Sequence, residues 1–95
     1  MSESPPTRRV RVVVSGEVQG VGYRWYCREE ALHRGLGGSV RNLSDGHVEA
    51  IFEGDPGAID SMIQWCRQGP SAANVQRVEV TEEQPTGEAR FVIAR

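Results

Sequence analysis

The sequence predicts a single α+β domain in which an antiparallel sheet carries two helices on one face. Segments rich in β-branched residues and two helical patterns follow one another in the order β-α-β-β-α-β. The chain has 95 residues, which is enough for one hydrophobic core. Its content of 38% hydrophobic and 25% charged residues is typical of a globular protein. We expect residues 10–95 to form the domain and residues 1–9 to be a flexible tail.

The first half of the predicted fold is a strand followed by a helix. Residues 10–15 contain three valines that alternate along one face, which indicates a largely buried strand. Neither Gly nor Pro interrupts residues 23–34, and Tyr23, Cys27 and Ala31 recur at helical spacing. These features predict a helix that packs one stripe of side chains on the core.

A hairpin and the start of a second helix come next. Residues 39–43 and 47–53 alternate as strands do, and the connection Ser44-Asp45-Gly46 contains the Asp-Gly pair favoured in tight turns. Asp55 is the expected N-cap of the following helix, with Pro56 at its first position.

The second helix and the last strands complete the pattern. Four apolar residues recur at helical spacing along the predicted helix: Ile59, Met62, Ile63 and Cys66. Residues 75–81 alternate again, and residues 91–94 provide a possible short fifth strand. The order is that of the split β-α-β, ferredoxin-like sandwich, a fold that hosts many unrelated activities.

The charged residues exclude several kinds of chemistry. The net charge is −2, so we expect no nucleic-acid partner. All 11 basic residues are arginines, which excludes a Schiff-base lysine and the lysine of a Walker phosphate loop. The cluster Arg8, Arg9 and Arg11 is read as a solvated strand entry rather than a nucleic-acid patch.

The cysteines and histidines do not indicate a metal site. The two cysteines, Cys27 and Cys66, form no C-x-x-C motif and are scattered along the chain together with His33 and His47, whereas tetrahedral sites use clustered ligands at short spacings. We expect no metal and no cofactor, and we read the cysteines as core residues rather than a disulfide. No apolar run approaches the roughly 18 residues of a membrane helix, and the N-terminal residues lack the apolar centre of a signal peptide. We therefore expect a cytoplasmic protein with no membrane partner.

The segment between the first strand and the first helix is rich in glycine. Gly16, Gly20 and Gly22 let successive backbone N–H groups turn toward one point, and the helix that follows adds its positive end. Arg24 lies in the first turn of that helix, where its guanidinium can hold two phosphate oxygens. Such a loop suits a phosphate-like dianion. Glycines alone, however, fit an ordinary strand–helix turn more readily, and the spacing matches neither common nucleotide-binding loop.

Two motifs make the segment specific. The sequence Val14-Ser15-Gly16-Glu17-Val18-Gln19-Gly20-Val21-Gly22-Tyr23-Arg24 resembles the acylphosphatase signature V-x-G-x-V-Q-G-V-x-[FY]-R at every fixed position. Gly38-Ser39-Val40-Arg41-Asn42, with Gly46, Val48 and Gly54, resembles the second signature of that family. Ser39 departs from it, since an aromatic residue is usual there. The resemblance extends from Val10 to Ile93.

The resemblance implies a metal-independent hydrolase of the carboxyl–phosphate bond. The phosphate-binding loop would hold the phosphoryl group with backbone N–H donors: Gly16, Glu17, Val18, Gln19, Gly20, Val21, Gly22 and Tyr23. Arg24 would stabilise the phosphoryl charge, and Asn42 would position the attacking water. Phosphoryl transfer to water depends on positioning and charge stabilisation, and a carboxylate leaves without a general acid. The implied substrate is a small acyl phosphate, with inorganic phosphate as product and inhibitor.

Three other functions are weighed against this one. An RNA-binding or small-molecule sensor module on the same fold is possible, but an RNA-recognition sheet needs exposed aromatic residues, and Phe52 and Phe91 are the only strand aromatics. A metal-carrying ferredoxin-like domain would need a C-x-x-C motif. Similar domains also begin larger carbamoyl-phosphate-using enzymes, but we expect a stand-alone, monomeric enzyme. Trp25 and Tyr26 can stack on a ligand, although helix–sheet packing is the favoured interpretation.

Overall fold

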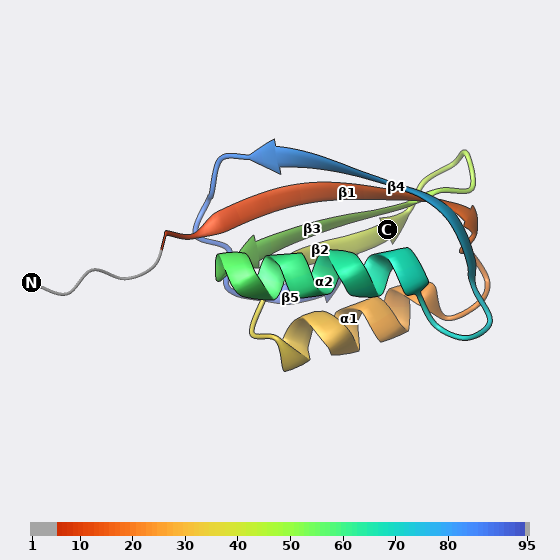
Figure 1. Ribbon diagram of the computed structural model, residues 1–95, viewed down its shortest axis with the longest axis horizontal. Coiled ribbons are helices and arrows are strands. Elements are labelled where there is room, and N and C mark those ends of the chain that lie inside the picture. The colour runs from red at the N-terminus through yellow and green to blue at the C-terminus, as the bar shows by residue number, and fades with distance from the viewer. Residues whose placement is uncertain (1–5, 95) are drawn as a thin grey trace, which may run out of the picture.

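Two helices cover one face of a five-stranded sheet in the computed structural model, which describes residues 6–94 (Figure 1). In chain order the elements are β1 (Arg8–Glu17), α1 (Tyr23–His33), β2 (Gly37–Asn42), β3 (Val48–Gly54), α2 (Pro56–Gln68), β4 (Asn74–Glu83) and β5 (Phe91–Ile93). The strands lie side by side in the order β4-β1-β3-β2-β5. This arrangement confirms the predicted ferredoxin-like sandwich and its fifth strand.

The fifth strand makes the sheet mixed. β1 pairs antiparallel with β3 and with β4, and β2 pairs antiparallel with β3, but β5 runs parallel to β2. An entirely antiparallel sheet was expected, so this edge is a correction. β4 and β5 lie at opposite edges of the sheet and run in opposite directions, and segment 84–90 crosses the end of the sheet between them. β5 therefore enters the sheet in the same direction as β2.

The first strand begins earlier than the alternation of valines indicates. β1 starts at Arg8, so Arg8 and Arg9 belong to the sheet rather than to the expected tail, whose residues 1–5 lie outside the described residues. Arg8 is hydrogen-bonded to Glu82 and Asp60, and Arg9 to Glu53 and other groups. Ion pairs therefore extend the strand beyond its apolar core.

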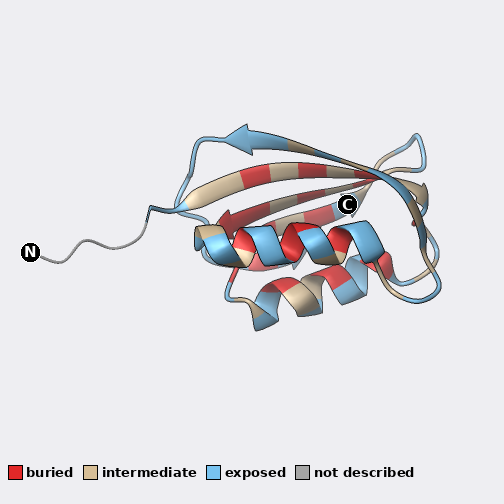
Figure 2. Cartoon of the chain, in the orientation of Figure 1, coloured by how far each residue is buried: buried red, intermediate tan, exposed pale blue. Residues whose placement is uncertain are grey.

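The core lies between the sheet and the two helices, where the buried stripes of α1 and α2 face the sheet (Figure 2). The predicted stripe of α2 is buried, and so are Tyr23, Cys27 and Ala31 of α1. Cys27 and Cys66 are fully buried free thiols, as predicted. Burial also raises the pKa of the Cys27 thiol, which keeps it protonated. Among the described residues, no helix is both long and apolar enough to cross a membrane.

Local signals in the sequence determine the start of α2. The Asp55 carboxylate accepts a hydrogen bond from the backbone N–H of Ala58 at 3.0 Å, and Pro56 occupies the first helical position. Both features were predicted from the residue types.

A buried carboxylate holds the segment that leads to β5. Glu53 is 2% exposed and accepts hydrogen bonds from the backbone N–H groups of Thr86, Gly87 and Glu88, and from the guanidinium of Arg9. Burial alone would raise the pKa of Glu53, but these donors outweigh burial and lower its pKa to about 2. The tether fixes the path along which the chain returns to the sheet.

Candidate functional site

The glycine-rich loop starts from an irregularity in the sheet. The register between β1 and β4 shifts between Ser15 and Gly16. Gly16 has φ +123°, and a side chain there would overlap the carbonyl oxygen of Asn74 in β4. Only glycine fits this close approach, which turns the chain out of the sheet toward α1.

Two buried side chains anchor the loop. Val18 and Tyr23 are each 1% exposed and belong to the core. The Tyr23 hydroxyl donates a hydrogen bond to the carbonyl oxygen of Cys66 in α2 at 3.0 Å, and its ring packs on Trp65 at 5.3 Å between centroids. The turn between these anchors is therefore held at both ends.

The N-terminus of α1 presents free hydrogen-bond donors. Gly22 is the N-cap residue in a left-handed conformation, with φ 80°, and no side chain caps the helix. The first intrahelical bond runs from Tyr26 N–H to the Gly22 carbonyl, so the N–H groups of the preceding residues have no acceptor within the helix. The first turn carries no acidic residue either. The positive end of the helix is thus available to an anion.

Arg24 lies in this first turn and is exposed. Among the ion pairs and side-chain hydrogen bonds of residues 6–94, none involves its guanidinium. An arginine without a carboxylate partner, placed at a helix N-terminus that does not favour a cation, can pair with a bound anion.

Asn42 is the last residue of β2 and lies on the same face of the sheet as the buried Val40. It pairs with Val48 of β3 across a tight turn. Its Oδ1 atom is buried and is the one such side-chain atom of the described residues that has no hydrogen-bond partner. A hydrogen-bond donor bound inside the cavity would satisfy this oxygen, either where it lies or after the side-chain amide rotates by a half-turn to present the oxygen to the cavity.

Gln19 connects the loop to the strand that carries Asn42. Its Nε2 donates to the carbonyl oxygens of Leu43 and His47, both at 2.8 Å. These two residues also close the turn between β2 and β3, since Leu43 N–H donates to the His47 carbonyl at 2.8 Å. One side chain thus joins two segments that lie far apart in the sequence.

A cavity of about 210 Å³ joins these parts. Its lining comes from the loop, α1, the end of β2 and β5: Val18, Gly20, Gly22, Tyr23, Arg24, Trp25, Asn42 and Ile93. The predicted pair Arg24 and Asn42 therefore lies at one cavity. Of the other predicted loop residues, Gly16, Glu17, Gln19 and Val21 do not line it.

Trp25 and Ile93 are lining residues absent from the predicted site. The favoured interpretation of Trp25, packing between helix and sheet, is wrong because its side chain is 54% exposed. The helical period does indicate this exposure, since Trp25 lies two positions after the buried Tyr23 and hence on the opposite side of α1. Ile93 carries no comparable signal, because its position depends on the pairing of β5.

The cavity has an electropositive lining. No carboxylate lines it, and the Tyr23 phenol remains neutral because burial raises its pKa well above the usual range. Arg24 and the uncapped helix N-terminus are then the charged features near the cavity. The arrangement can bind a dianion and hold a water beside it, and it provides no carboxylate or histidine for proton transfer.

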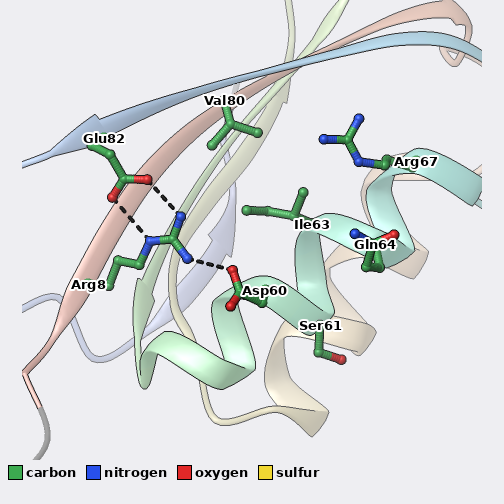
Figure 3. A pocket seen from close by; sticks show the side chains of 8 residues that line it. All are labelled: Arg8, Asp60, Ser61, Ile63, Gln64, Arg67, Val80 and Glu82. Carbon is green, nitrogen blue, oxygen red and sulfur yellow. Dashed lines mark hydrogen bonds and ion pairs between the residues drawn. The ribbon is translucent and has the colours of Figure 1, made fainter.

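A larger hollow of about 540 Å³ lies between α2 and the strands β1 and β4 (Figure 3). Arg8 lies in it, but its guanidinium donates to Glu82 at 2.7 and 3.1 Å on one side and to Asp60 at 2.7 Å on the other. Its charge is therefore already balanced by carboxylates. This hollow is open and offers no unpartnered buried polar atom, so the smaller cavity is the better candidate.

Ser39 lies away from the cavity. It pairs with Ile51 of β3 and Val92 of β5, and it points to the face of the sheet that carries no helix, because the neighbouring Val40 points into the core. The departure from the second signature therefore affects packing on the open face of the sheet and not the lining of the cavity.

Comparisons with known proteins agree with the geometry. A family model described as acylphosphatase matches residues 10–93. A relative from Rubrobacter xylanophilus named acylphosphatase is 53% identical over 95% of this chain and 82% of its own length. The crystal structure of an acylphosphatase from Bacillus subtilis superposes with a TM-score of 0.89 at 37% identity, covering 93% of this chain and 99% of that one. A full-length HypF protein, solved in a phosphate- and nucleotide-bound form, matches the whole chain with a TM-score of 0.91 at 26% identity, but over only 13% of its own length.

Proposed function

The chain belongs to the acylphosphatase family and hydrolyses acyl phosphates, and we propose that it does so through a water positioned by Asn42 and a phosphoryl group held by Arg24. The backbone N–H groups of the loop and of the first turn of α1 complete the phosphoryl site in this proposal. No metal and no covalent enzyme intermediate take part.

One observation carries the proposal: Arg24, Asn42 and the uncapped start of α1 line a single cavity. The three features have complementary roles. The guanidinium and the backbone donors can neutralise charge on the phosphoryl oxygens, and the amide of Asn42 can accept a hydrogen bond from water. Gln19 keeps the two halves of the cavity in register.

The proposed reaction is a single displacement at phosphorus. The water oxygen forms a bond to phosphorus while the bond between phosphorus and the carboxyl oxygen breaks. The carboxylate leaves with the bonding electron pair, and the proton lost by water passes to the phosphate product or to solvent. Because a carboxylate is stable as an anion, no general acid is needed, which fits a lining without carboxylate or histidine.

This mechanism predicts a narrow range of substrates, which hydrolysis measurements can test. Purified protein should hydrolyse acetyl phosphate and benzoyl phosphate at an undiminished rate in the presence of EDTA. It should leave p-nitrophenyl phosphate largely intact, because a site with one arginine and one amide is too sparse for a poorer leaving group. A protein-free sample corrects for spontaneous hydrolysis of the acyl phosphates.

The mechanism has clear contrary outcomes. Loss of activity on EDTA treatment, restored by a divalent cation, would show that a metal takes part. Equal rates on p-nitrophenyl phosphate and on an acyl phosphate would show that the site supplies more chemistry than the proposal assigns to it.

We also propose that the enzyme is a cytoplasmic monomer. Buried free thiols such as Cys27 and Cys66 suit a reducing compartment. The edge strand β4 carries Arg77 and Glu79, an ion pair at 2.8 Å, and charged edges discourage strand pairing between molecules. Sedimentation equilibrium should give the mass of one chain.

A further inference from the structure

Two apolar side chains at the cavity have no part in the proposed phosphoryl chemistry. Trp25 of α1 is 54% exposed and Ile93 of β5 is 41% exposed, and both line the cavity beside Arg24 and Asn42. Large apolar side chains that remain exposed next to a polar site commonly mark the place where an apolar part of a ligand binds. We call Trp25 and Ile93 the apolar rim.

The rim is held in place from two sides. The ring of Trp25 meets that of Tyr26 edge to face, with centroids 5.0 Å apart and planes at 86°. The Tyr26 ring in turn lies against Gly22, where an added Cβ atom would be 3.3 Å from Cε2. The indole is therefore supported by a second aromatic ring that rests on the phosphate loop itself.

Ile93 reaches the cavity through the alternation of β5. Phe91 is buried and stacks on Phe52 at 5.8 Å, Val92 points to the opposite face, and Ile93 points again toward the helices. The backbone is fixed next to Ile93 by a 2.8 Å hydrogen bond from Ala94 N–H to the Val40 carbonyl. The rim thus combines two elements that lie far apart in the sequence.

The position of the rim indicates what it binds. When the phosphoryl group lies against Arg24 and the start of α1, the acyl group must extend away from these donors. The rim offers that group a flat indole and a branched aliphatic side chain and carries no charge. Resting on the proposed function, we propose that Trp25 and Ile93 bind the acyl group and make the enzyme selective for acyl phosphates with an aromatic or bulky apolar acyl group.

The test compares two substrates that differ only in the acyl group. The wild-type protein should show a higher kcat/KM for benzoyl phosphate than for acetyl phosphate. In Trp25→Ala the ratio of the two kcat/KM values should fall by about five- to tenfold, the scale of one lost aromatic contact. Trp25→Phe should recover most of the ratio, and Ile93→Ala should lower it by a smaller factor. Leu32→Ala removes another exposed apolar side chain of α1 and should leave the ratio unchanged.

The outcomes separate this inference from the proposed function. If the wild-type protein hydrolyses neither substrate, the proposed function fails, and the inference fails with it. If it hydrolyses both but the ratio is unchanged in Trp25→Ala and in Ile93→Ala, the enzyme is an acylphosphatase and the rim assignment is wrong. Equal kcat/KM values for the two substrates in the wild-type protein overturn the rim assignment as well.

Fluorescence provides a readout without turnover. The chain has two tryptophans, so Trp65→Phe leaves Trp25 as the reporter and keeps an aromatic ring against Tyr23. Saturating benzylphosphonate, which carries an aryl group beside a phosphate-like dianion, should change the Trp25 emission more than saturating methylphosphonate does. Equal changes with the two probes would show that the aryl group does not reach the indole.

Discussion

Arg24 differs from most arginines of the described chain in what surrounds it. Arg8, Arg9 and Arg11 each pair with carboxylates, and Arg41 shares Glu49 with Arg11. Those pairs are structural, and the guanidinium groups of Arg11 and Arg41 hold the pKa of Glu49 below its usual range even though burial alone would raise it. Arg24, by contrast, has a cavity beside it instead of an acid, so its charge is available to a ligand.

Replacement of Arg24 tests its contact with the phosphoryl group. In Arg24→Ala we expect weaker inhibition by inorganic phosphate and a lower kcat, with a combined cost of at least about 3 kcal/mol, because the guanidinium binds in the ground state and more strongly in the transition state. Arg24→Lys should recover little, since a point charge cannot make a forked contact. Steady-state kinetics with phosphate as competitor measures both effects.

Arg28→Ala is the matched control for this prediction. It removes an arginine from the same helix, one that pairs with Glu29 on the surface, and it should leave both parameters near their wild-type values. Normal phosphate inhibition in Arg24→Ala would remove Arg24 from the phosphoryl site.

Replacement of Asn42 should lower the turnover rate without changing the binding of inorganic phosphate. Because its amide is proposed to hold water, Asn42→Ala should lower kcat by at least ~100-fold, the scale of one lost positioning contact in the transition state. The inhibition constant for inorganic phosphate should stay nearly unchanged. Asn74→Ala, an exposed asparagine at the start of β4, serves as the control. A variant of Asn42 that turns over normally at saturation but no longer binds phosphate would reverse the assigned roles.

Among the structural elements, the loop between β1 and α1 is hydrogen-bonded to the turn after β2 through one side chain, that of Gln19. The amide of Gln19 satisfies two carbonyl groups at once, at Leu43 and His47. Without these two hydrogen bonds, Asn42 would remain on β2 and the helix N-terminus on α1, but the two would lose the contact that fixes their relative position.

Removal of this connection should reduce activity more than stability. In Gln19→Ala we expect a loss of about 1–2 kcal/mol in unfolding free energy from two hydrogen bonds. We also expect a drop in kcat/KM of at least about tenfold, because small displacements of positioned groups cost more in rate than in stability. Chemical denaturation and steady-state kinetics measure the two quantities.

Gln19→Glu sharpens this prediction. The carboxylate keeps the shape of the side chain but has no N–H to donate and repels the two carbonyl oxygens, so its kcat/KM should be no higher than that of the alanine variant. Gln76→Ala, on the exposed edge strand β4, is the control. Full activity in Gln19→Glu would show that the two hydrogen bonds do not position the site.

The elements also show what the sequence could and could not predict. The alternation of valines, the Asp-Gly turn and the Asp55 cap are local signals, so β1, the hairpin and α2 were predicted near their observed positions. The direction of β5 was not predicted, because a three-residue strand carries no signal of register or partner. The motifs indicated Arg24 and Asn42, whereas the contribution of Ile93 to the cavity depends on that unpredicted pairing.

At the level of the whole molecule, Glu53 connects β3 to the segment that leads into the edge strand β5. Its carboxylate lies at the end of β3 and accepts hydrogen bonds from residues 86–88, which precede β5. Because the ionised form is the one that accepts these bonds, the protonation state of a single buried group affects the attachment of an edge of the sheet.

Acid should therefore destabilise the fold through Glu53. Its pKa is about 2 in the folded protein and 4.5 in the unfolded chain, so its stabilising effect is complete above pH 4.5 and is lost as the pH falls through about 2. The lost contribution is about 3 kcal/mol. Urea denaturation at pH 7, 4 and 2.5 should show this decline in the wild-type protein.

Glu53→Gln should have a lower unfolding free energy at pH 7 by at least about 2 kcal/mol, since an amide cannot accept all of these bonds. Its stability should also fall less between pH 4.5 and 2.5 than that of the wild type. Glu83→Gln removes a more exposed partner of Arg9 and should change stability by less than about 1 kcal/mol. The same pH dependence in Glu53→Gln as in the wild type would assign the acid sensitivity to other groups.

The residues that line the cavity come from elements of unequal size, and this affects which of them can change during evolution. Arg24 belongs to an 11-residue helix and Asn42 ends a strand inside the sheet, whereas Ile93 comes from a 3-residue strand at its edge. Substitutions at Ile93 and its exposed neighbour Val92 disturb few buried contacts, because Phe91 is the one buried residue of β5. Descendants of this gene can therefore acquire new acyl preferences through substitutions at the end of β5, while the groups that face the phosphate are inherited unaltered.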